Sequence, residues 1–262
     1  MKIANIMTAD PVTISATAPL SEALSTLEEL GIRHLPVVES ETVVGVISDR
    51  DLLEATGWMW DEERGKAPVI IADLVKSSPV TVSPEDSVAE LASQLIQGHF
   101  GCAPVVEGTR LVGIVTEIDV LTALTTGDTE AETESSAEGH TVGDRMSREV
   151  LTLGVDSTAD DALEMLRGAR VRHVPVLDDG KVRGMLSDRD LRRVVGRALP
   201  GSTSVREFMT SAVQTAAPTD ALRSTARTMA QLKIGGLPVV EAGDLVGIIT
   251  ITDLLAYCAL RT

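Results

Sequence analysis

Four segments of the sequence share the pattern Gly-x-x-Ser/Thr-x-x-Asp, in which a hydroxyl and a carboxylate lie three residues apart. An apolar strand leads into each pattern, and a helix is expected to begin there. A helix N-terminus offers unpaired backbone N–H groups and the positive end of the helix dipole, which suit a phosphate. A carboxylate one turn on offers two oxygens to the two hydroxyls of a ribose. These segments are candidates for nucleotide binding, with the pairs Ser48 and Asp51, Thr116 and Asp119, Ser187 and Asp190, and Thr250 and Asp253.

The same spacing also has a structural explanation. Ser-x-x-Asp at the start of a helix is a capping box, in which the two residues satisfy backbone groups and no ligand is needed. A capping box accounts neither for the glycine three residues before the hydroxyl, such as Gly45, nor for the four occurrences. A glycine is expected where a ligand or another backbone comes close. On the motif alone both interpretations stay open.

The motifs belong to a repeat of about 55 residues that occurs four times. Each copy is predicted to run β-α-β-β-α, with a short β-branched strand, an amphipathic helix, two strands joined by a polar turn, and a final helix. In the first copy Pro19 is expected in the first turn of the helix and Gly31 at its end. In the second copy the helix is expected to begin at Ser83 to Asp86, with Pro84 at its first position.

The copies alternate in the order A-B-A-B, because "IRHLPVV" at 32–38 returns as "VRHVPVL" at 171–177. Units this small have little core of their own, so we expect them to pack in pairs. The sequence predicts an α+β fold in which two pairs associate face to face into a pseudo-symmetric disc. The predicted domains are a first pair at 1–125 (copies about 1–58 and 68–125), an acidic flexible linker at 126–140, and a second pair at 141–262 (copies about 141–199 and 203–262).

Composition and motifs exclude several classes of function. The net charge is −16 and no Lys/Arg-rich run is present, so nucleic acid is not expected as the main partner. Cys102 and Cys258 fit neither a disulfide framework nor a metal site. No signal peptide and no run of ~18 apolar residues is found, so we expect a cytoplasmic protein without a membrane span. No catalytic triad order, Walker loop or GxGxxG occurs, and catalysis is not expected.

On the four motifs, each preceded by an x-Pro-Val strand, the chain resembles CBS domains, which are called after cystathionine β-synthase, and each pair resembles a Bateman module. The resemblance covers nearly the whole chain outside the linker. It implies a non-catalytic regulatory module that binds AMP, ADP, ATP or S-adenosylmethionine between repeats, needs no metal, and signals to a separate, unidentified protein. The alternative is an interaction scaffold with structural or vestigial pockets. The resemblance leaves open whether the chain forms a homodimer.

The resemblance also assigns roles to residues. It gives the four hydroxyl and acid pairs to ribose and phosphate contact. Related subunits of AMP-activated protein kinase carry a second hydroxyl just before the acid, where this chain has Thr252, which matches, Ile118, which departs, and Arg50 and Arg189. A basic residue three before the strand proline contacts phosphates in that family, and the apolar residue before it lines the adenine pocket. The positions are Arg33 and Arg172 for the first role, and Ile32, Phe100, Val171 and Ile234 for the second.

Two further features stand outside the motif. The second and fourth copies have Gly101 and Gly235 where the A copies have arginine, so phosphates are expected at the A copies. His34 and His173 are expected to pack within their strands. Trp58 and Trp60, in the connector between the first two copies, either cover a partner surface or pack locally.

Overall fold

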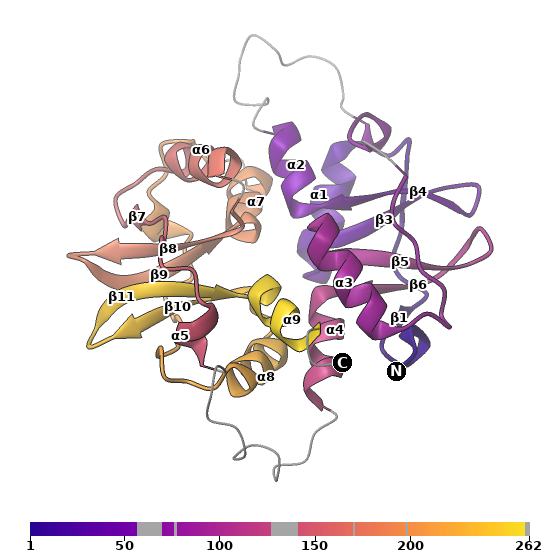
Figure 1. Cartoon of the computed structure of the whole chain (residues 1–262). Coiled ribbons are helices and arrows are strands. Elements are labelled where there is room, and N and C mark those ends of the chain that lie inside the picture. The colour runs from indigo at the N-terminus through magenta and orange to yellow at the C-terminus, as the bar shows by residue number, and fades with distance from the viewer. Residues whose placement is uncertain (57–69, 76–77, 127–140, 170, 198, 260–262) are drawn as a thin grey trace.

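The computed structural model describes residues 1–56, 70–75, 78–126, 141–169, 171–197 and 199–259. Trp58, Trp60 and all but the first residue of the predicted linker lie outside these residues. The described chain contains four units arranged as two pairs, so the predicted α+β fold is confirmed (Figure 1). The first and third units run β-α-β-β-α, whereas in the second and fourth the leading strand is reduced to a single parallel bridge, Val82 to Val105 and Ala216 to Val239.

The helices and strands follow the repeats. The first copy consists of η1 Ile3–Asn5, β1 Thr8–Ala9, β2 Ile14–Ser15, α1 Leu20–Leu30, β3 His34–Glu39, β4 Thr42–Ser48 and α2 Asp49–Thr56. The second copy consists of η2 Ile71–Asp73, α3 Val88–Gly98, β5 Cys102–Glu107, β6 Arg110–Thr116 and α4 Glu117–Thr126. The third copy consists of α5 Val142–Arg145, β7 Leu153–Gly154, α6 Ala159–Ala169, β8 His173–Asp178, β9 Lys181–Ser187 and α7 Asp188–Gly196. The fourth copy consists of η4 Val205–Glu207, α8 Leu222–Leu232, β10 Gly236–Glu241, β11 Asp244–Thr250 and α9 Ile251–Ala259.

The strands pair in the same way in every copy. The two long strands form an antiparallel hairpin whose register shifts at the same place, for example between Val37 and Val38. The short leading segment lies parallel to the first long strand, as β2 does on β3 and β7 on β8. In the first pair the strands join into one sheet through β4 and β6, in the order β1-β6-β4-β3-β2 with β5 on β6. Each motif therefore stands at the end of the second long strand of its hairpin.

Two of the predicted helix starts differ from the structure. Pro19 is the N-cap of α1, and the helix begins one residue later, at Leu20; Gly31 ends it with a left-handed φ of 63°. The segment from Ser83 to Asp86 is not a helix start, because α3 begins at Val88 with Ser87 as N-cap. Instead the Asp86 carboxylate accepts the Ser83 backbone N–H at 2.8 Å and closes a turn. The capping residues stabilise that turn, and the helix starts only after it.

The motif glycines lie where another segment of the chain comes close. A Cβ on Gly113 would lie 2.7 Å from the Met7 sulfur, and one on Gly247 would lie 2.5 Å from the Met146 sulfur. The close neighbour always belongs to the other copy of the pair, and for Gly45 it is Val75. At Gly45 the approaching group is therefore a side chain of the other copy and not the expected ligand or backbone, whereas at Gly113 the Thr8 carbonyl oxygen also lies 3.1 Å from the Cβ position.

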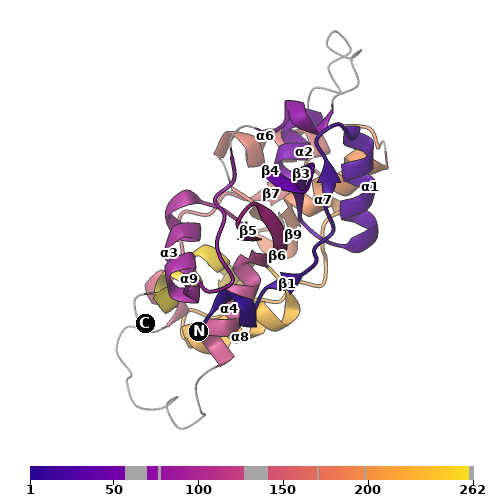
Figure 2. The same cartoon turned by 90° about the vertical axis from the view of Figure 1, so that its right-hand side faces the viewer.

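Helices join the two pairs. α2 packs against α7, while α4 packs against α8 and α9, and these helices lie between the two sheets in Figure 1. Leu91 and Leu121 of the second copy share one hydrophobic core with Leu222 and Leu254 of the fourth. Both views place the first and third copies at one end and the second and fourth at the other (Figure 2). The pairs therefore associate face to face, as predicted.

A buried ion pair crosses this interface at α2 and α7. The Arg192 Nε lies 2.7 Å from the Asp49 Oδ1, and the two side chains are 3% and 6% exposed. In the repeat, the position that matches Arg192 is Leu53 and the position that matches Asp49 is Asp188. The interface therefore has the ion pair on one side of the pseudo-twofold axis only.

We predict that Arg192→Leu, which introduces the residue found at the matching position, lowers the free energy of unfolding by about 3–5 kcal/mol, because it leaves the Asp49 carboxylate buried without its partner. Urea denaturation measures the change. The control is Arg192→Leu combined with Asp49→Asn, which should recover much of the loss. A single variant as stable as the parent would show that the ion pair does not stabilise the interface.

Candidate functional site

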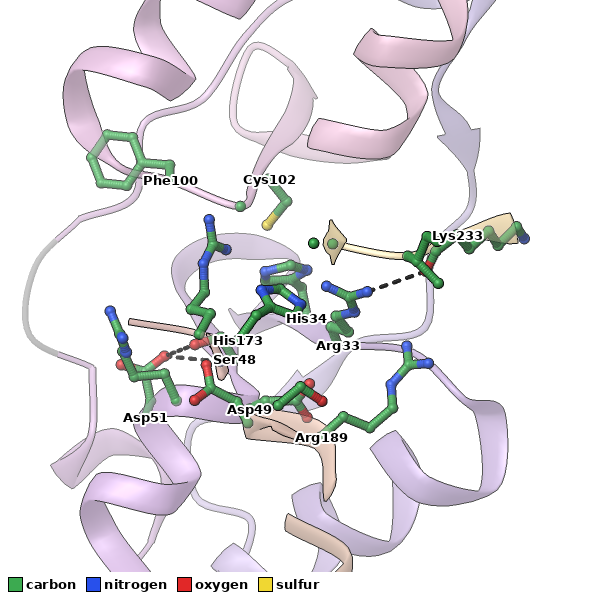
Figure 3. Close-up of a pocket in the computed structure, with 18 of the residues that line it drawn as sticks. Arg33, His34, Ser48, Asp49, Asp51, Phe100, Cys102, His173, Arg189 and Lys233 are labelled. Carbon is green, nitrogen blue, oxygen red and sulfur yellow. Dashed lines mark hydrogen bonds between the residues drawn. The ribbon is translucent and has the colours of Figure 1, made fainter. Parts of the chain in front are cut away.

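A cavity of about 540 Å³ lies at the centre of the molecule, between the two pairs, and all four copies line it (Figure 3). We call it the central cavity. One part of its lining, the Asp51 half, is built on the first pair with Ser48, Asp51, Val80 and Phe100, and Arg172 of the second pair extends into it. The other part, the Asp190 half, is built on the second pair with Ser187, Asp190, Gln214 and Ile234, and Arg33 of the first pair extends into it.

Each half combines residues from both copies of its pair. The hydroxyl and acid come from the strand-to-helix junction of one copy, and the apolar wall comes from the other copy. The wall includes the segments 78–80 and 212–214, which precede the first helix of the second and fourth copies and which sequence reasoning missed. The recurring strand before each helix was the signal that could have identified them.

The central cavity contains only some of the predicted binding residues. Phe100 and Ile234 line it, whereas their counterparts Ile32 and Val171 do not. The hydroxyl and acid pairs of the A copies line it together with Arg33, Arg50, Arg172 and Arg189. The motif residues of the B copies do not line this cavity, namely Thr116, Ile118, Asp119, Thr250, Thr252 and Asp253.

In all four motifs the acid caps its own helix. Asp51 Oδ2 accepts both the Ser48 backbone N–H, at 2.9 Å, and the Ser48 hydroxyl, at 2.5 Å, as the dashed lines in Figure 3 show. Asp119, Asp190 and Asp253 accept the same two bonds through Oδ2 at 2.7–2.9 Å. The capping interpretation is therefore correct for all four acids. The capping bonds use one oxygen of each carboxylate and hold the side chain in a fixed orientation.

The arginines of the A copies extend across the interface into the opposite pair. Arg33 donates to the Lys233 carbonyl at 3.3 Å, and Arg172 donates to the Glu117 carboxylate at 3.1 Å. Arg50 donates to the Val171 carbonyl at 3.2 Å, and Arg189 to the Gly31 carbonyl at 3.4 Å. Each of the four guanidinium groups thus connects the two pairs, a contact that the sequence could not reveal.

His34 and His173 also line the central cavity. They occupy the space that the glycines of the B copies leave, since a Cβ on Gly101 would lie 2.5 Å from His34 Nε2 and one on Gly235 the same distance from His173 Nε2. Burial, and then the nearby Arg33 and Arg172, lower the pKa of both imidazoles to about 3. Both histidines are therefore neutral at physiological pH and add no positive charge to the cavity.

Two carboxylates at the starts of α2 and α7 are buried beside the cavity. Burial raises the pKa of Asp49, although Arg192, Arg33 and Arg189 oppose the shift. Burial raises the pKa of Asp188 to about 7, although Arg50 and Arg172 oppose it. Asp188 therefore changes charge near neutral pH. The Cys102 thiol also lines the cavity, and burial raises its pKa far above the usual range.

Fold and site together define a class of protein: two pairs of α+β units around a shared central cavity. Residues 3–57, 71–126, 142–197 and 205–260 match the sequence model of the CBS domain, and the chain belongs to the CBS domain family. Among the helices that the structure describes, none is long and apolar enough to cross a membrane. Within the same residues no group of three or more His, Cys, Asp or Glu is placed to hold a metal ion.

Two archaeal proteins are similar over the full length. The uncharacterized protein MJ1225 of Methanocaldococcus jannaschii is 27% identical over 95% of each chain. Its crystal structure, described as that of a candidate archaeal homolog of g-AMPK, gives a TM-score of 0.84 at 24% identity and covers 98% of this chain and 99% of that one. A conserved protein of Pyrococcus horikoshii gives a TM-score of 0.66 at 26% identity and covers 98% and 100%. These similarities support the four-unit fold.

We predict that Asp188→Asn stabilises the protein more at pH 8 than at pH 5. The ordinary pKa of the carboxyl is 3.8 and the folded value is about 7, so between these values only the folded state binds the proton. Stability from this group is present at low pH and is lost as the pH rises through 7. The difference in Tm between variant and parent should grow by at least about 2 °C from pH 5 to pH 8. Asp156→Asn, at an exposed site, is the control and should show no such trend.

Proposed function

We propose that the chain is a non-catalytic sensor that binds an adenine nucleotide or S-adenosylmethionine in the central cavity and signals to a separate protein. The observation that supports this most strongly is the composition of that cavity. Two hydroxyl and acid pairs at helix N-termini line it together with five arginines, which come from both pairs. Oriented carboxylates suit ribose hydroxyls, and arginines beside helix N-termini suit phosphates.

The apolar walls complete a site for an adenosyl group. Val80 and Phe100 in one half, and Ile234 and Leu237 in the other, offer apolar surface to a purine. A cavity of this kind, apolar with a few convergent polar groups, is typical of small-molecule sites. These groups support binding as the activity of the site.

The way in which the arginines join the pairs supports a regulatory role. Arg33, Arg50 and Arg189 each donate to a backbone carbonyl of the opposite pair. An anionic ligand competes for these guanidinium groups, so the bound and free states differ in the contacts between the pairs. A ligand shifts a conformational equilibrium only by such differential interaction. A change in the relative position of the pairs is the signal that a partner would detect.

The alternative function is an interaction scaffold with structural pockets. The observation that favours it is the capping bond made by all four acids, which occurs without any ligand. A scaffold would show no rise in Tm with adenosine, AMP, ATP or S-adenosylmethionine, whereas a ligand that binds the native state raises its apparent stability.

We predict that two double variants separate the ribose and phosphate contacts. Asp51→Asn with Asp190→Asn should weaken adenosine, AMP and ATP alike, because the ribose is common to them and the capping acceptor is kept. Arg33→Ala with Arg172→Ala should weaken ATP by about tenfold or more and leave adenosine little changed, because only charge-assisted bonds to phosphate are lost. Calorimetric titration measures both.

Equal losses for adenosine and ATP in the arginine double variant would show that Arg33 and Arg172 are structural. Lys2→Ala with Lys181→Ala is the matched control for charge, because both lysines are exposed and pair with surface carboxylates. It should leave all three affinities unchanged.

A further inference from the structure

The two halves of the central cavity differ in charge, although the repeat makes their motifs alike. We propose that the Asp190 half selects a nucleoside triphosphate or diphosphate, while the Asp51 half takes an adenosyl ligand with little negative charge. The inference rests on the proposed function and assigns a different ligand class to each half. Five pairs of matching positions that differ between the halves carry it.

The first difference concerns the two arginines that cross the interface. Arg172 lies beside Gly101, in the Asp51 half, and its guanidinium forms an ion pair with Glu117 at 3.1 Å. The Glu117 side chain is only 10% exposed, so little water screens the pair. The charge of Arg172 is therefore offset in part by a carboxylate before any ligand binds.

Arg33 lies at the matching place in the other half, beside Gly235 and Lys233. The residue that corresponds to Glu117 in the fourth copy is Ile251. Among the described residues no carboxylate forms an ion pair with Arg33, whose Nη2 donates to the Lys233 carbonyl at 3.3 Å (Figure 3). Two carboxylates lie near Arg33, but Asp49 pairs with Arg192 and Glu117 pairs with Arg172. Arg33 therefore brings a positive charge to the Asp190 half that a phosphate can neutralise.

Two more cations line the cavity in the Asp190 half. Arg193 has its Nη1 3.6 Å from Asp190 Oδ1, with a side chain 48% exposed, whereas the first copy has Glu54 at this position in the sequence. Lys233 lines the cavity where the second copy has His99.

Arg189 lies close to Arg33, and Arg50 occupies the matching position of the first copy. The Arg189 Nε is buried and has no hydrogen-bond partner within the described part of the chain. Burial first, and then the charge of Arg189, lower the pKa of Arg33. Such a cluster favours a multiply charged anion.

The apolar walls of the two halves also differ, because the half with less positive charge has the aromatic wall. The Asp51 half has Phe100, whose side chain is partly exposed at the cavity, and Val80. The Asp190 half has Ile234 and Gln214 at these positions. An aromatic face stacks on a purine better than an aliphatic side chain does. The Asp51 half therefore binds mainly through the base and ribose, and the Asp190 half mainly through the phosphates.

The experiment uses full-length proteins in which one half is impaired. Asp51→Asn leaves the Asp190 half, and Asp190→Asn leaves the Asp51 half. Each is titrated with adenosine, AMP and ATP by calorimetry after its Tm shows that it is folded. The Asp51→Asn protein should bind ATP about tenfold or more tightly than AMP, and the Asp190→Asn protein should bind the two within about threefold of each other. Should an Asn variant fail to fold, Phe100→Glu and Ile234→Glu block the walls of the same halves.

A second change should convert one half into the other. In the Asp190→Asn protein, Glu117→Gln keeps the shape of the side chain and releases Arg172 from its ion pair. The affinity for ATP should rise about tenfold, with adenosine unchanged. In the Asp51→Asn protein, Arg33→Gln should lower the affinity for ATP by a similar factor.

The outcomes separate this inference from the proposed function. Equal preference for ATP over AMP in the two single-half proteins, or no effect of Glu117→Gln, would overturn the inference and leave nucleotide binding intact. The same holds if either folded single-half protein binds none of the three ligands. Absence of binding by the parent protein would overturn both.

Discussion

The contact between α2 and α7 determines most of what the centre of this molecule can do. Both helices begin with the same Asp-Arg-Asp sequence, and packing them together brings two helix N-termini and six charged side chains to the middle of the disc. Charges in such a place need partners, because burial of an unpaired charge is costly. The pair Asp49 and Arg192, the pair Arg172 and Glu117, and the bonds from arginine to carbonyl groups meet this need. The same arginines remain available to an anion, so the groups that satisfy the buried charges can also form a binding site.

The A-B-A-B order has a steric reason at this interface. An A copy contributes large residues, arginine and histidine, at the start of its first long strand, and a B copy contributes glycine at the same position. His34 fills the space over Gly101, and His173 the space over Gly235. Four identical A copies would place imidazoles and guanidinium groups in the same volume. The alternation therefore lets one chain keep a pseudo-twofold disc and still concentrate charge at its centre.

Much of this structure could be predicted from the sequence because its determinants are local. The order of elements followed from hydrophobic period, and the position of each motif followed from the strand before it and the helix after it. The prediction for Ser83 to Asp86 was wrong because a capping box also closes a turn, and local sequence does not distinguish the two. Ile32 and Val171 do not line the central cavity, which takes its apolar walls from the B copies, and their assignment to an adenine pocket stays a prediction. The crossing of the arginines depends on how the pairs pack, which no single repeat encodes.

The departures from repeat symmetry are more informative than the repeats themselves. Where the copies agree, the side chains cap helices, fill cores or, as Arg33 and Arg172 do, cross between the pairs. At Glu117 and Ile251 the matching positions disagree, and the change alters the charge beside the arginine that crosses from the opposite pair. Replacing a buried ion pair by apolar residues often leaves the free energy of unfolding unchanged. The ion pair in one half and the aliphatic side chain in the other are therefore expected to stabilise the interface to a similar extent. Stability alone therefore does not require the difference, and a difference in the charge of the bound ligand gives it a physical reason.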